Sequence, residues 1–209
     1  MRQPLTLLLC LAFSTAAQAG DVQVAVAANF ASPMARIGQA FTLATGHVAK
    51  VSTGSTGKFY TQIVSGAPFE VLLAADDETP NKLVADGHAV AASNFTYAIG
   101  KLVLWSATPG FVDAQGAVLT SDRVKHVAMA NPKLAPYGAA ALEHLKARGL
   151  ADGLNAKLVT AESIAQAYQF VLTGNAEVGF VALSQVAVPG KPAIGSWWLV
   201  PQGEYRQIR

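Results

Sequence analysis

Four segments of this 209-residue chain place small neutral hydrogen-bonding residues where a helix is expected to start. They are Asn29 with Ser32-Pro33, the run Gly54-Ser55-Thr56-Gly57, the run Pro136-Tyr137-Gly138, and Ser163-Ile164 after Glu162. A helix N-terminus exposes unpaired backbone N–H groups and the positive end of a dipole, so it can hold an anion. Plain N-capping explains any one segment by itself. Four of them, split between the two halves of the chain, favour a small anion held between two lobes.

The side chains at these starts are suited to an oxyanion. The amide NH2 of Asn29 can donate a hydrogen bond, as can the adjacent hydroxyls of Ser55 and Thr56. The glycines around those hydroxyls let the backbone approach a ligand closely, although a flexible capped turn is the alternative. Tyr137 taken alone is a half-buried turn aromatic, and Ile164 offers only its backbone N–H.

The glycine-rich loop also has two enzymatic interpretations. A nucleotide P-loop is excluded, because it would need Gly at position 52 and a hydroxyl at position 59, where the chain has Ser52 and Phe59. Ser55-x-x-Lys58 does match the S-x-x-K of serine acylases such as penicillin-binding proteins and β-lactamases. No K-T-G or S-D-N triplet follows, and the chain is short for that fold, so the acylase is the weaker hypothesis. Lys58, near the start of a helix, is expected to face solvent.

Composition and histidine spacing exclude other classes of function. The four histidines, His47, His88, His126 and His144, have no partner at metal-ligand spacing. The run Asp76-Asp77-Glu78 most simply starts a helix at Thr79. The chain is 52% hydrophobic and 13% charged with a net charge of +2, which gives ample core and no basic patch for nucleic acid.

Residues 1–19 have the pattern of a secretory signal peptide. A short positive region precedes the apolar stretch Leu5–Phe13, and Ala17-Gln18-Ala19 predicts cleavage after Ala19. The stretch is too short to span a bilayer, which needs about 20 residues. Cys10, the only cysteine, lies within the signal; lipidation there is an alternative that Leu9 before it disfavours. The mature chain therefore depends on no disulfide.

The rest of the chain alternates between predicted strands and helices. The strands are expected at residues 21–27, 48–52, 69–75, 95–105, 126–130, 157–160, 177–182 and 196–200. The helices are expected at residues 33–45, 57–65, 79–85, 138–147 and 163–172. Such repetition predicts an α/β fold with parallel sheets covered on both faces. Ligands in these folds sit beyond the carboxyl ends of the strands, where the four candidate helices begin.

Several separate blocks resemble the periplasmic molybdate-binding proteins of ABC importers. The blocks are residues 24–30 (VAVAANF), 54–63 (GSTGKFYTQI), 66–71 (GAPFEV) with 74–76 (AAD), 95–106 (FTYAIGKLVLWS) and 131–138 (NPKLAPYG). The resemblance covers residues 20–209. It implies a two-lobe type II periplasmic binding protein fold, mostly parallel sheets flanked by helices, with the ligand cleft between the lobes.

The resemblance also implies a ligand and the residues that hold it. Molybdate or tungstate would be bound by Ala28, Asn29, Ser55, Thr56, Tyr137 and Ile164 and delivered to the membrane subunits of an ABC permease. The protein would be a periplasmic monomer without cofactor or catalysis. Some family members add a Tyr after the late strand; Ala182 stands there in this chain, so that contact is absent. A binding protein for another tetrahedral oxyanion, such as sulfate, is the leading alternative.

The resemblance divides the chain into lobes. Lobe one would comprise residues 20–97 and 195–209, and lobe two residues 98–194, with hinges near Tyr97–Lys101 and Gly195–Val200. Family members continue beyond the position of Arg209. Lobe one is therefore expected to lack its terminal elements and to be less stable than in the rest of the family.

Overall fold

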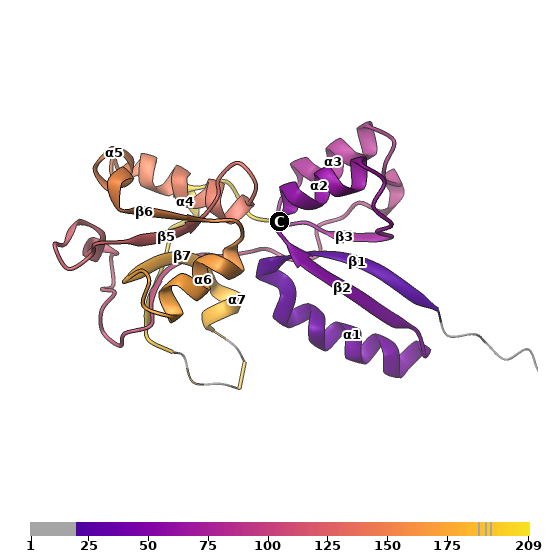
Figure 1. Ribbon diagram of the computed structural model, residues 1–209, viewed down its shortest axis with the longest axis horizontal. Helices are drawn as coiled ribbons and strands as arrows, with labels where there is room; N and C mark the ends of the chain where they lie inside the picture. The colour runs from indigo at the N-terminus through magenta and orange to yellow at the C-terminus, as the bar shows by residue number, and fades with distance from the viewer. Residues whose placement is uncertain (1–19, 188, 191, 193) are drawn as a thin grey trace, which may run out of the picture.

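The computed structural model describes residues 20–187, 189, 190, 192 and 194–209. The described residues form two α/β lobes that lie side by side (Figure 1). The predicted signal peptide, including Cys10, lies outside the described residues. No helix in the part of the chain that is described is both long and apolar enough to cross a membrane.

The first lobe is built on a three-stranded parallel sheet in the order β2-β1-β3. Its strands are β1 (Asp21–Ala27), β2 (Val48–Gly54) and β3 (Val71–Leu73). Its helices are η1 (Ala28–Phe30), α1 (Ala31–Thr45), α2 (Thr56–Val64), α3 (Glu78–Ala85) and η2 (Ala91–Ser93). Helix α1 lies on one face of the sheet, and α2 and α3 lie on the other (Figure 1).

The second lobe is built on a five-stranded sheet in the order β6-β5-β7-β4-β8. Its strands are β4 (Leu102–Ser106), β5 (Val127–Ala130), β6 (Leu158–Ala161), β7 (Val178–Ala182) and β8 (Ser196–Leu199). Its helices are η3 (Ala117–Thr120), α4 (Pro136–Ala147), α5 (Ala151–Leu154), η4 (Asn155–Lys157), α6 (Ile164–Leu172), α7 (Leu183–Val186) and η5 (Gln202–Glu204). Strand β5 runs parallel to β6 and β7, whereas β4 runs antiparallel to β7 and β8. The predicted α/β fold class is confirmed.

Strand register brings the helix starts together. Ala27 pairs with Gly54 at the ends of β1 and β2, so η1 and the start of α2 leave the first sheet side by side. Ala130 pairs with Ala161 at the ends of β5 and β6, which places the starts of α4 and α6 together in the second lobe. Both pairs of helix starts therefore lie at the carboxyl ends of parallel strands, as predicted.

The larger hydrophobic core extends across the boundary between the lobes. It is centred on fully buried residues of the second sheet, including Trp105 and Phe180, and it also contains Ala27, Ala28 and Ala75 of the first lobe. The first lobe adds a small cluster of Val24, Val26 and Met34. Its sheet is less covered than the second, and Val48, Val51 and Val71 are 38–42% exposed.

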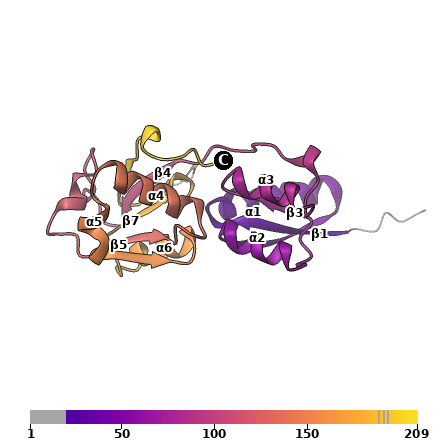
Figure 2. The ribbon, with the colours of Figure 1, turned by 90° about the horizontal axis from the view of Figure 1, so that it is seen from above.

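Three expectations about the elements are corrected. Helix α1 begins at Ala31, two residues before the expected start at position 33, so Ser32 lies inside the helix. Residues 95–101 do not form a strand. They cross from one lobe to the other beside the C-terminal end, and their β-type pairing with it is the isolated Gly100–Ile208 bridge (Figure 2). Residues 196–199, assigned above to lobe one, form β8 of the second sheet, where Trp198 pairs with Leu104. The remaining lobe boundaries stay a prediction.

A buried histidine joins the C-terminal segment to α4. His144 is 1% exposed, and its Nδ1 lies 2.6 Å from Oε2 of Glu204. Arg148 Nε donates to both carboxylate oxygens of Glu204 at 3.0 Å. Burial lowers the pKa of His144 below its ordinary 6.5 despite the opposing effect of Glu204. The folded protein thus keeps this imidazole neutral where the unfolded chain would protonate it.

The lowered pKa of His144 predicts a loss of stability in mild acid. Below about pH 6.5 His144 binds a proton in the unfolded state but stays neutral in the folded state. The free energy of unfolding therefore falls as pH falls through this range. Melting temperatures measured from pH 7.5 to 5.0 should decline in the wild type and decline less in His144→Gln, which retains a hydrogen-bonding group but does not titrate. An equal pH slope in both proteins would contradict this origin.

Candidate functional site

The glycine-flanked loop forms a buried helix start. Ser55 has extended backbone angles (φ −81°, ψ 147°) and is the N-cap residue of α2, and Thr56 is the first helical residue. The two side chains are only 4% and 1% exposed. Ser55 makes no side-chain capping bond, so its hydroxyl is not used by the helix. Capping, the alternative raised by the sequence, therefore does not account for this serine.

The two hydroxyls of the loop differ in their partners. Thr56 Oγ1 accepts a hydrogen bond from the backbone N–H of Ala75 at 3.2 Å, which ties α2 to the segment after β3. Ser55 Oγ is buried and has no hydrogen-bond partner among the described residues. A buried polar group without a partner costs about 1–3 kcal/mol, so such groups are retained where something else satisfies them. Ser55 is thus the clearest indication of a polar ligand in the structure.

Asn29 and Tyr137 meet across the boundary between the lobes. The side chain of Asn29 and the backbone of Lys101 lie near enough to the phenol of Tyr137 to influence its pKa, and both lower it. Tyr137 is 2% exposed, and burial raises its pKa well above the ordinary range, so the phenol stays protonated and neutral. The backbone carbonyl of Asn29 accepts a hydrogen bond from Ser184 Oγ at 2.7 Å, a second tie between the lobes.

Ile164 lies at the start of α6, as the sequence predicts. Ser163 caps this helix by accepting a hydrogen bond from the N–H of Gln166 at 3.4 Å. The carbonyl of Ile164 accepts a hydrogen bond from Gln185 Nε2 at 3.3 Å, and Gln185 Oε1 accepts one from the N–H of Ala182 at 2.9 Å. The backbone N–H of Ile164 lies in the first turn of the helix, where no intrahelical acceptor exists for it.

Sequence analysis missed Ser184 and Gln185. They follow β7 and begin α7, so the rule that ligand-proximal residues follow strands would have drawn attention to them. Their roles depend on the other lobe and on a different helix, and no local sequence pattern specifies such partners. Ala28, by contrast, was named and is buried in the core that joins the lobes.

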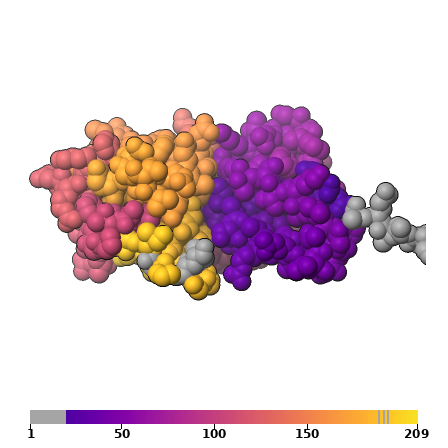
Figure 3. Space-filling model, turned by 60° about the horizontal axis from the view of Figure 1, so that its bottom comes forward, coloured from indigo at the N-terminus to yellow at the C-terminus, as the bar shows by residue number. Residues whose placement is uncertain are grey.

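Two further contacts bring the start of α2 against the second lobe. The backbone N–H of Gly57 donates to the carbonyl of Leu134 at 2.9 Å. Lys58 Nζ lies 2.5 Å from Glu162 Oε2, just before α6. The expectation that Lys58 simply faces solvent is corrected, because the half-exposed ammonium pairs with a carboxylate of the other lobe. In the space-filling view the atoms of the two lobes touch along their boundary (Figure 3).

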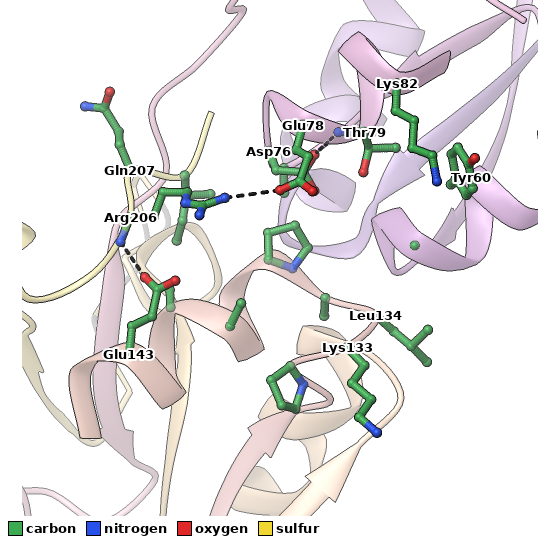
Figure 4. Close-up of a pocket in the computed structure, with 18 residues that line it drawn as sticks. Tyr60, Asp76, Glu78, Thr79, Lys82, Lys133, Leu134, Glu143, Arg206 and Gln207 are labelled. Atoms are coloured by element: carbon green, nitrogen blue, oxygen red, sulfur yellow. Dashed lines mark hydrogen bonds and ion pairs between the residues drawn. The ribbon is translucent and has the colours of Figure 1, made fainter. Parts of the chain in front are cut away.

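A charged hollow of about 360 Å³ opens beside this region, between α3, α4 and the C-terminal segment (Figure 4). On its wall Arg206 Nη1 pairs with Glu78 Oε2 at 3.1 Å, and Asp76 accepts the N–H of Thr79 at 2.7 Å. Burial raises the pKa of Asp76 above its ordinary value. Gly57 contributes to the lining, whereas Asn29, Ser55 and Tyr137 do not. We therefore distinguish this hollow from the candidate anion site.

The candidate site has no charged side chain of its own. Its six predicted members are Ala28, Asn29, Ser55, Thr56, Tyr137 and Ile164, and the contacts above join the lobes next to several of them. Nowhere in the described residues do three or more His, Cys, Asp or Glu side chains gather as a metal site would require. The arrangement offers amide, hydroxyl and backbone N–H donors, which suits an oxyanion and not a metal cation.

The chain matches the model of one protein family over most of its length. A family described as "Bacterial extracellular solute-binding protein" matches residues 22–209. This chain belongs to that family. Two lobes with a neutral donor set between them are consistent with solute binding.

Individual members of the solute-binding family resemble the chain closely. It is 61% identical to the molybdate-binding protein ModA of Azotobacter vinelandii over 194 residues. This matched region is 93% of this chain and 77% of that protein. It is 55% identical over 203 residues to ModA of Rhodobacter capsulatus, with 97% and 79% covered. The solved structure of the periplasmic molybdate-binding protein of Azotobacter vinelandii superposes with a TM-score of 0.87 at 44% identity, covering 90% of this chain and 82% of that one.

The position of Tyr137 in this solute-binding protein depends on its neighbour Gly138. A Cβ at Gly138 would lie 2.2 Å from the carbonyl oxygen of Ala130, so only glycine lets α4 start this close to β5. We expect Gly138→Ala to lower the free energy of unfolding by about 1–3 kcal/mol or more, the range for overpacking. Denaturant unfolding measures this. Gly153→Ala in α5 is the matched control, since nothing lies within 4 Å of its Cβ; equal stability of the two variants would refute the steric argument.

Proposed function

We propose that this protein captures molybdate or tungstate between its two lobes and delivers it to the membrane subunits of an ABC importer. The proposal rests on one observation above all: the buried Ser55 hydroxyl, at a helix start beside the other lobe, has no hydrogen-bond partner in the part of the chain that the structure describes. The chain around it is 61% and 55% identical to proteins named for molybdate binding.

The proposed binding mode uses dipoles in place of a counter-charge. Hydroxyls of Ser55, Thr56 and Tyr137, the amide of Asn29 and the backbone N–H of Ile164 would converge on a tetrahedral dianion. Thr56 can still donate its proton, because the bond to Ala75 uses its oxygen as acceptor. Hydrogen bonds to charged groups contribute about 1.5–3 kcal/mol each, so five such bonds can outweigh the cost of desolvating and ordering the ligand.

Selectivity would follow from size and protonation. A cavity shaped for molybdate should hold the smaller sulfate loosely. Phosphate carries a proton near neutral pH and would need a strong acceptor, and the six proposed residues include no carboxylate to accept it. Sulfate binding is therefore the second candidate function.

The geometry does not support the serine acylase. An acylase would require Lys58 to act as a base on Ser55, but Lys58 Nζ pairs with Glu162 at 2.5 Å. Ser55 Oγ has no hydrogen-bond partner that could accept its proton among the described residues. We propose that the protein is a binding protein without catalysis.

The proposed setting is the periplasm. Residues 1–19 would direct export and be removed after Ala19. The mature protein is proposed to act as a monomer, without a cofactor and without nucleic acid, and its partners would be the oxyanion and the permease.

Calorimetric titration of the mature protein with molybdate, tungstate and sulfate tests the function. We expect one site per chain, micromolar or tighter affinity for molybdate and tungstate, and much weaker binding of sulfate. Tighter binding of sulfate than of molybdate would favour the second candidate. Labelling of Ser55 by a penicillin-like probe would favour the acylase.

Replacement of Ser55 tests the proposed donor directly. Ser55→Ala should weaken molybdate binding by about 1–3 kcal/mol, the range for a lost bond to a charged group. The unliganded protein should keep its stability or gain some, because the variant removes a buried hydroxyl that has no partner. Ser65→Ala, at the exposed other end of α2, is the matched control and should change neither quantity. Unchanged affinity in Ser55→Ala would remove Ser55 from the site.

A further inference from the structure

An ion pair outside the proposed site joins two of the helix starts that the site uses, those of α2 and α6. Lys58 is the third residue of α2, two positions after Thr56, and Glu162 stands two positions before Ile164. Lys58 Nζ and Glu162 Oε2 are 2.5 Å apart, and their side chains are 44% and 72% exposed. We propose that this pair is an electrostatic latch that forms when the lobes close and slows release of the bound oxyanion. This inference rests on the proposed function.

Backbone hydrogen bonds fix the segments that carry the two partners. Glu162 donates its backbone N–H to Gln166 Oε1 at 2.7 Å, which fixes the turn before α6. Next to Lys58, the N–H of Gly57 donates to the Leu134 carbonyl of the second lobe at 2.9 Å. A Cβ at Gly57 would lie 3.0 Å from that same carbonyl oxygen. The backbones of the two lobes are therefore in direct contact beside the ion pair, and an opening motion would separate the charges.

The charges of Lys58 and Glu162 can stabilise the closed arrangement of the lobes although they lie outside the proposed site. The lysine holds the pKa of Glu162 below its ordinary value, so this carboxylate stays ionised well into mild acid. Because the two charges neutralise each other, the pair adds no net charge beside an anion that neutral dipoles are proposed to hold. The latch should therefore change the release rate of different oxyanions by a similar factor and leave selectivity unchanged.

The expected size of the effect is modest because the pair is exposed. Exposed ion pairs stabilise a structure only slightly, so we expect release to be about two- to fivefold faster without the latch. Salt should remove the difference, since the screening length falls from about 10 Å at 0.1 M to about 3 Å at 1 M. Association should change little, because a contact that forms after encounter acts mainly on dissociation.

The test compares Lys58→Ala and Glu162→Gln with a matched lysine variant. Lys50 pairs with Asp21 at 2.6 Å within the first lobe, with exposures of 55% and 46%, so Lys50→Ala removes a similar ion pair that does not cross the cleft. Stopped-flow fluorescence would measure molybdate release at 20 mM and 1 M NaCl. We expect about two- to fivefold faster release in Lys58→Ala and Glu162→Gln at low salt only, and wild-type release in Lys50→Ala.

Exchange of the charges separates a latch from a structural role. Lys58→Glu combined with Glu162→Lys should restore slow release, whereas either reversal alone should accelerate it most. Wild-type release rates in the Lys58 and Glu162 variants at low salt, or equal acceleration in Lys50→Ala, would overturn the latch. A change in the ratio of molybdate to sulfate affinity would overturn the claim that the pair leaves selectivity unchanged.

A measurement without ligand distinguishes failure of the latch from failure of the proposed function. Hydrogen exchange of the Gly57 amide reports closure directly, since its acceptor Leu134 belongs to the other lobe. The latch predicts faster exchange in ligand-free Lys58→Ala than in wild type at low salt, and equal rates would overturn it. Absence of molybdate binding in the wild-type titration would instead overturn the proposed function.

Discussion

A buried position between two lobes can accept a doubly charged ion only if enough dipoles converge on it. In this protein the proposed convergence would follow from strand register. Ala27 ends β1 beside Gly54 of β2, and Ala130 ends β5 beside Ala161 of β6. After each pair of strand ends, two helices begin side by side. The shared apolar core holds the two lobes, and with them the two pairs of helix starts, together. Backbone geometry, and not the net charge of the site, is therefore the basis of the proposed chemistry.

The lobes are joined by contacts of different kinds. The apolar core contributes Ala28 and Ala75 from the first lobe, and the hydrogen bond from Ser184 to the carbonyl of Asn29 adds a polar tie. The Lys58–Glu162 pair is the exposed, charged member of this set. Apolar burial and the uncharged hydrogen bonds respond little to salt, whereas an exposed ion pair is screened. The apolar and uncharged contacts of the interface should therefore stabilise it at any salt concentration, whereas the contribution of the ion pair should depend on ionic strength.

Several local features were predictable because local rules control them. Gly46, Gly87, Gly149 and Gly174 follow α1, α3, α4 and α6 with positive φ, where glycine is favoured because it has no Cβ. The Ser163 cap of α6 and the strand Asp21–Ala27 also agree with their patterns. Longer-range features were less predictable. Residues 95–101 have the composition of a strand but lie between the sheets, and β8 joined the second sheet because Trp198 pairs with Leu104.

The sequence by itself determined the α/β class, the helix starts that follow strands, and the neutral character of the candidate residues, because all three depend on residue types and spacing along the chain. Tertiary structure decided which of two adjacent hydroxyls is left without a partner. Thr56 is satisfied by Ala75, a residue brought near by β3, while Ser55 is not satisfied. Tertiary structure also turned Lys58 from a solvent-facing residue into one half of a contact between lobes, because its partner Glu162 is 104 positions away in the chain. No local pattern encodes a partner at that separation, since it is set by how two independently built sheets pack against each other.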